Sequence, residues 1–365
     1  MDNKFLTLIV IAFLGTTISR TLRMGTAFLT ISEGFSFLSL LAATFAIGRI
    51  LSSYLSGIST EKYGSKVASL GISVIALTGL GYAVLPAVTY LPLRILHGLA
   101  SGIAWPSLQT LVMSSVGEEK RGRASSLYFI ATNSAWILAF LIGSIIDRNA
   151  MVVSSALLIL IALVMLKLDV RVGVKAKKGK GKGKKRFVPP NEAIALGGLA
   201  VGFMTLLVNT EVAIAVLGLE FEKTVIGIVL AVAALIGAVV SYLVNRKLID
   251  YLETHLSLLL PSVATPVAST LIYVSPMTSS VGVLVTKAAV SWWRSTLLGL
   301  SRAQETGKRV GLFNSSADAG RIIGAFIASQ GAAMLPILSA LSFVLGLASW
   351  TLSLKSRGEV SEDKK

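Results

Sequence analysis

The sequence predicts an all-α integral membrane protein with twelve transmembrane helices, six on each side of a central basic segment. The prediction rests on composition, on the length of the apolar stretches and on the positions of the basic residues. Of the 365 residues, 54% are hydrophobic and only 14% are charged, and the mean hydropathy is +0.77. A soluble domain is about 25% charged, and one this apolar would have too little polar surface to cover itself.

Six apolar stretches occupy the first half of the chain, at 5–29, 35–58, 67–86, 91–113, 124–146 and 150–168. A helix needs ~20 apolar residues to cross the hydrocarbon core, and these lengths fit. Basic turns separate several of them, with Lys62 and Lys66 after the second, Lys120–Arg123 after the fourth and Arg148 after the fifth. We predict helices because an open strand cannot satisfy its backbone in lipid, and barrel strands would be shorter and would alternate apolar with polar residues.

Residues 169–190 separate a first bundle at 1–168 from a second at 191–365. This segment contains Lys-Gly repeats and ends in Pro189-Pro190, which is typical of a solvated linker. A tether at the anionic inner leaflet is the simpler interpretation, and regulation by specific lipids is the alternative. Six more apolar stretches follow, at 192–218, 224–244, 256–274, 279–299, 310–331 and 334–354.

Lysine and arginine gather on one side of this predicted topology. If the N-terminus is cytoplasmic, that side holds the linker, the tail and four basic turns, whereas the opposite side has only Arg148 and Lys223 clearly outside a helix. The positive-inside rule then predicts that both termini lie in the cytoplasm. We expect the membrane to be the plasma membrane. Because topology explains the net charge of +16, we expect the lipid bilayer, and no nucleic acid, as a partner.

The composition argues against several kinds of chemistry. The chain has no cysteine, and His97 and His255, its only histidines, lie far apart in the sequence. Disulfides, thiolate chemistry, a metal site and a histidine triad are therefore not expected. A G-x-x-x-x-G-K-[ST] motif is absent, which argues against an ATP-driven pump. With no nucleophile–base pair or acidic metal cluster in the helices, we expect no enzyme and no cofactor.

The turn after the second stretch carries a charged motif with two glycines. Residues 57–66 read GISTEKYGSK. Glycine permits a tight turn, and an acid with bases at a cytoplasmic helix end can form a charge-assisted lock with neighbouring helix termini. The motif resembles the loop signature of the major facilitator superfamily, G-x-x-x-D-[RK]-x-G-x-[RK], with Glu61 in place of the usual Asp and Ser65 where Arg is frequent. The resemblance implies a gating role for Gly57, Glu61, Lys62, Gly64 and Lys66.

The fourth stretch is also similar to this superfamily, in its R-x-x-x-G pattern. Arg94, Gly98, Gly102 and Pro106 follow one another at four-residue spacing and therefore share one helix face. Small residues on such a face let membrane helices pack closely, so we expect Arg94 to act in packing or gating. The second half repeats the layout weakly, with residues 245–247 in the place of Glu61 and Lys62.

The resemblance implies the major facilitator fold, two six-helix pseudo-repeats that rock around a central site and open alternately to each side. It further implies secondary active transport of a small solute by a monomer, with protons as the coupling ion. The first, fourth, seventh and tenth helices are expected to line the central cavity.

Charges inside the apolar stretches mark candidate sites, because a charge at mid-bilayer is costly and usually faces a cavity or a partner. The acids Glu211 and Asp318 are the proton-coupling candidates. Structural interpretations stay open for all of these residues. Arg20 and Arg23 could extend their side chains to the outer membrane interface, or Arg20 could pair with Glu211. Asp318 could pair with Arg321, three residues further along the chain. The substrate-binding candidates are Arg20, Arg49, Asn209, Arg294 and Arg321, and the other intramembrane cations are Arg23, Arg94 and Lys287.

These seven cations against two acids favour an anionic or carboxylate-bearing solute, because arginine binds carboxylate and phosphate in a bidentate manner. A proton-driven multidrug or sugar exporter is the alternative within the same class. A transporter-like membrane sensor or a lipid-handling protein is the alternative from another class.

Overall fold

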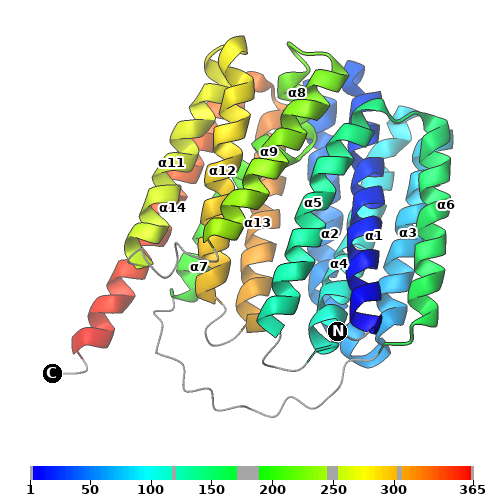
Figure 1. The fold of residues 1–365 in the computed structure, drawn as a ribbon. Coiled ribbons are helices and arrows are strands. Elements are labelled where there is room, and N and C mark those ends of the chain that lie inside the picture. The colour runs from blue at the N-terminus through cyan, green and yellow to red at the C-terminus, as the bar shows by residue number, and fades with distance from the viewer. Residues whose placement is uncertain (1–2, 117–120, 171–188, 245–253, 302–305, 363–365) are drawn as a thin grey trace. The chain divides into compact units, whose positions relative to one another are not determined.

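The computed structural model describes residues 3–116, 121–170, 189–244, 254–301 and 306–362. All regular structure in these ranges is helical (Figure 1), and helices lie on each of the twelve apolar stretches, so the all-α prediction is confirmed. Within the described ranges, seven helical segments are long and apolar enough on their own to cross a bilayer. Twelve membrane crossings stay a prediction.

The chain forms two compact units. The first comprises residues 1–34, 43–178 and 222–231, and the second comprises residues 35–42, 179–221 and 232–365. Six helices make up most of the first unit: α1 (Asn3–Leu29), α2 (Phe35–Tyr63), α3 (Ser65–Val84), α4 (Tyr90–Ser114), α5 (Arg121–Ile145) and α6 (Arg148–Lys167). Helix α1 packs against α5, and α3 packs against α4 and α6.

Glycines of α4 bring it into backbone contact with α2. A Cβ atom at Gly98 would lie 3.0 Å from the Arg49 amide nitrogen and would overlap the Phe45 carbonyl oxygen, and one at Gly102 would lie 2.8 Å from the Arg49 carbonyl oxygen. The predicted small-residue face of this helix therefore packs directly on α2, as close helix crossings in membranes require.

The second unit is built around α7 (Asn191–Asn209), which packs against three other helices of the unit. The unit also contains α8 (Glu211–Leu217), α11 (Thr254–Val274), α12 (Pro276–Ser301), α13 (Thr306–Ser329), α14 (Leu335–Glu362) and the part of α9 (Lys223–Leu243) from residue 232 onward. Helix α7 contacts α12, α13 and α14. Gly198 and Gly202 bring α7 against the backbone of α13 at Phe313 and Ala317, so that a small-residue face again permits a close crossing.

The prediction of one unbroken helix over 192–218 is wrong. Helix α7 ends at Asn209, and α8 begins at Glu211 after Thr210, whose backbone is extended (φ −133°, ψ −176°). The Thr210 hydroxyl donates to the Leu206 carbonyl (2.6 Å) and accepts from the Val212 amide (3.2 Å). A side chain that replaces backbone hydrogen bonds in this way competes with the helix, and hydropathy does not detect it.

Candidate functional site

Arg20 lies in the first unit, partly exposed, between two groups of α5. One guanidinium nitrogen donates to the Thr132 carbonyl oxygen, and the guanidinium carbon lies 4.4 Å from the centre of the Trp136 ring. Trp136 in turn stacks on Phe140, with the ring centres 5.3 Å apart. A carbonyl dipole and an aromatic face both attract a cation, so both contacts stabilise the Arg20 guanidinium against α5.

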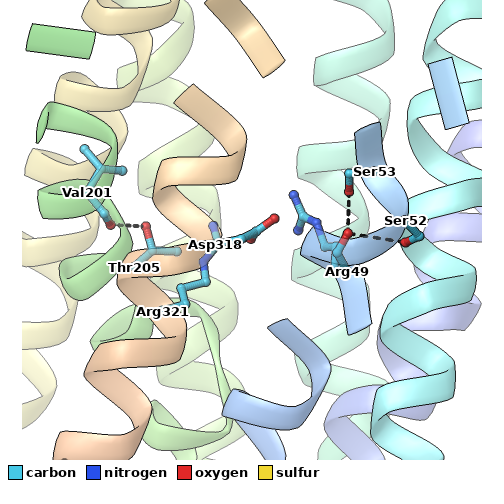
Figure 2. Close-up of polar contacts among 7 residues, drawn as sticks. All are labelled: Arg49, Ser52, Ser53, Val201, Thr205, Asp318 and Arg321. Carbon is cyan, nitrogen blue, oxygen red and sulfur yellow. Dashed lines mark hydrogen bonds and ion pairs between the residues drawn. The ribbon is translucent and has the colours of Figure 1, made fainter. Parts of the chain in front are cut away.

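Arg49 lies on α2, also in the first unit. Its carbonyl oxygen accepts hydrogen bonds from Ser52 (3.3 Å) and Ser53 (2.8 Å) (Figure 2). Tyr128 of α5 is buried, and its hydroxyl donates to the Trp105 carbonyl oxygen at 3.0 Å. The structure thus places two predicted substrate-binding arginines on different helices, Arg20 on α1 and Arg49 on α2.

The surroundings of Arg94 differ from those of Arg20 and Arg49. It is fully buried and donates to the Arg23 carbonyl oxygen (2.5 Å) and to the Thr26 hydroxyl. Its guanidinium also lies 5.2 Å from the centre of the Tyr82 ring. These contacts tie α4 to α1 and α3.

His97, one turn further along α4, completes this polar core. Its Nε2 atom lies 3.2 Å from the Ser19 hydroxyl, and its Nδ1 atom lies 3.3 Å from the Tyr82 hydroxyl. Phe45 packs edge-on against the imidazole. The Arg23 guanidinium carbon lies 3.8 Å from the centre of the Phe45 ring. We interpret His97 as a satisfied contact between helices.

Gly64 makes the turn in the loop motif. It has φ +61°, a conformation that favours glycine, and its amide donates to the Thr60 carbonyl oxygen at 2.9 Å. Gly57 lies within α2, and the charged side chains of Glu61, Lys62 and Lys66 are exposed.

Two polar contacts near this motif were not anticipated from the sequence. The Thr60 hydroxyl donates to Ser107 of α4 at 2.7 Å. The Ser65 amide donates to the Val170 carbonyl oxygen at 2.9 Å, and the Val170 amide donates back to the Ser65 hydroxyl at 3.2 Å. The end of α2 and the start of the linker are thus fixed to the rest of the first unit.

The break between α7 and α8 carries the polar candidates of the second unit. Asn209 and Glu211 flank it and are both buried. The Lys287 ammonium of α12 donates to the Asn209 side-chain oxygen. No sequence pattern predicts this pairing, because the two residues are 78 positions apart.

Asp318 and Arg321 form an ion pair on α13 (Figure 2). The pairing expected from the three-residue spacing is therefore observed. The Asp318 side chain is 2% exposed and that of Arg321 is 14% exposed. Arg294, the remaining candidate, is partly exposed on α12.

Several expectations fall outside the residues that the structure describes. These are most of the linker predicted at 169–190, the basic turn at Lys120 and the second-half counterpart of the loop motif at 245–247.

A family model for the major facilitator superfamily matches residues 5–325. The chain belongs to the major facilitator superfamily. It is accordingly a multi-pass membrane protein, and the family supports secondary transport. No curated protein matches this sequence.

Solved structures of this superfamily show the same fold. The nucleoside transporter NupG, in a mutant form, is 14% identical with a TM-score of 0.74, covering 96% of this chain and 100% of that chain. The xylose transporter XylE from E. coli, in an inward-open conformation, is 13% identical with a TM-score of 0.70, covering 95% and 96%. A bacterial homologue of the human lysosomal transporter Spinster is 14% identical with a TM-score of 0.69, covering 96% and 93%. At these identities the similarity establishes the fold alone.

Proposed function

We propose that this superfamily member transports a small organic anion by alternating access, driven by protons and acting as a monomer in the plasma membrane. The substrate-binding residues in this proposal are Arg20, Arg49, Asn209, Arg294 and Arg321. Glu211 or Asp318 carries the coupling proton.

The observation that carries the proposal is the setting of Arg20. This guanidinium on α1 is partly exposed, donates to the Thr132 carbonyl oxygen and lies 4.4 Å from the centre of the Trp136 ring. Within a membrane, a guanidinium favours an anionic solute group such as a carboxylate or a phosphate. A guanidinium offers such an anion a planar pair of donors.

Removing either arginine is expected to weaken solute binding. The purified protein in detergent is first screened by thermal unfolding against organic anions, cations, sugars and drugs, because a ligand of the folded state raises the midpoint. Arg20→Ala and Arg49→Ala should each raise the Kd of the best anion by ~10-fold or more, since a charge-assisted hydrogen bond contributes ~1.5–3 kcal/mol.

The control for this experiment is Arg148→Ala, which removes an exposed arginine at the start of α6 and should bind like the parent protein. Stabilisation by lipophilic cations or neutral solutes alone would contradict the proposal and favour an exporter of those compounds.

We also propose that both termini lie in the cytoplasm, supported by the distribution of lysine and arginine. A reporter fused after Lys180 should report cytoplasm, and one fused after Met277 should report the outside. Signals on the opposite sides would reverse the orientation.

A further inference from the structure

The start of the linker is attached to the turn of the loop motif at two points. The Ser65 amide donates to the Val170 carbonyl oxygen at 2.9 Å, and the Ser65 hydroxyl accepts from the Val170 amide at 3.2 Å. Ser65 is the first residue of α3 and directly follows Gly64, which makes the turn. Both backbone groups of Val170 are therefore bonded to the residue that ends the turn.

The side chain of Val170 has an apolar seat in the first unit. It is 9% exposed and belongs to a buried cluster that α1, α3, α4, α5 and α6 all contribute to. Members of this cluster from the five helices include Phe5, Ala68, Leu111, Ala124 and Met165. Removing an apolar side chain from water is favourable, so the hydrophobic effect and the two hydrogen bonds hold residue 170 in the same position.

The backbone between α6 and Val170 opposes this attachment. Helix α6 ends at Lys167, and Asp169 has φ +37°, a positive value that no other non-glycine residue in the described ranges adopts. The left-handed region is unfavourable for residues with a side chain. Backbone strain of this kind persists only where the surrounding contacts hold it, and it is frequent in switch segments.

We propose that Asp169 and Val170 form a releasable latch on the loop motif (residues 57–66). While Val170 is seated, its bonds to Ser65 hold the loop motif in place; when Val170 leaves the cluster, the strain at Asp169 is relieved and the loop motif is free to move. Segments held by few contacts open locally without unfolding of the helices around them. Because the latch begins the linker, a movement of the linker is transmitted to the loop motif. The device does not depend on which solute is transported.

The test measures release of the latch by thiol labelling, because the chain has no cysteine of its own. Val170→Cys keeps the backbone groups that bond Ser65, and its thiol reacts with a maleimide when residue 170 leaves the cluster. Lys167→Cys, at an exposed position, gives the rate of a free thiol, and Met165→Cys, fully buried in the same cluster, gives the rate at which the cluster itself opens. In full-length protein in detergent, Val170→Cys should react ~10-fold or more faster than Met165→Cys and more slowly than Lys167→Cys.

A second substitution shows whether Ser65 holds the latch. Ser65→Ala in the Val170→Cys background removes one of the two hydrogen bonds and should speed labelling by ~2–10-fold. The matched control is Ser69→Ala in the same background. The Ser69 hydroxyl donates to the Ala162 carbonyl oxygen at 2.7 Å, so this variant also removes a bond between α3 and α6, but one away from the latch, and labelling should not change.

The loop motif is followed separately with Thr60→Cys, at a fully buried position near the end of α2. Ser65→Ala should speed its labelling too, because release of the latch frees the loop motif. If Thr60→Cys does not respond while Val170→Cys does, the linker is released alone and the proposed coupling is wrong.

A static attachment gives another pattern, in which Val170→Cys reacts as slowly as Met165→Cys and Ser65→Ala leaves that rate unchanged; this result overturns the proposal. If Val170→Cys does not fold, hydrogen exchange of the Val170 amide decides instead. In the parent protein this amide should exchange faster than those of α6, and faster still in Ser65→Ala. Equal protection of the Val170 amide in both proteins would likewise overturn the latch.

Discussion

Replacing Asp318 with asparagine is expected to abolish solute accumulation driven by a proton gradient while solute exchange continues. The carboxylate is buried on α13 and paired with Arg321, so that its protonation would release a cation within the second unit. Asparagine is nearly the same size but cannot take up a proton. Uptake into proteoliposomes, with and without an imposed pH gradient, measures the two modes separately.

Stability must be separated from coupling, because removing one partner of a buried ion pair destabilises a protein. The double variant Asp318→Asn/Arg321→Gln should recover the thermal midpoint without recovering pH-driven uptake. Glu220→Gln, which changes an exposed acid bonded to Ser279 at 3.0 Å, should keep both modes. Glu211→Gln tests the other candidate acid, and pH-driven uptake in both Asp318→Asn and Glu211→Gln would remove these residues from the coupling mechanism.

Gly98→Ala is expected to destabilise the first unit markedly. The new methyl group would meet the backbone of α2 at Phe45 and Arg49, and a backbone cannot move aside as a side chain can. Overpacking of this kind costs ~1–3 kcal/mol, which corresponds to a loss of about 2–12 °C in the midpoint of a unit of this size. Thermal unfolding in detergent measures the change.

The matched control is Gly81→Ala in α3. Its methyl group would meet only the side chain of Leu93, at 3.0–3.7 Å, and a leucine side chain can shift, so the midpoint should change little. Equal midpoints for the two variants would show that α2 and α4 do not cross closely at Gly98.

The sequence was sufficient for features that depend on residues close together in the chain. Runs of ~20 apolar residues are enough to predict helices in a membrane, and helical spacing alone predicted the Asp318–Arg321 pair and the small-residue face of Gly98 and Gly102. The loop motif at 57–66 was sufficient to suggest the superfamily, which the family match over residues 5–325 confirms.

Only the tertiary structure decided what each intramembrane charge contacts. Arg20 meets a carbonyl of α5, Arg94 meets a carbonyl of α1, and Lys287 meets Asn209 at the end of α7. The helix break at Thr210 could likewise not be predicted from the sequence, because no glycine or proline lies there. Carbonyl oxygens and helix breaks carry no signature in hydropathy or spacing, so the partners of a buried charge are set by which helices pack together, and that packing is a property of the folded chain.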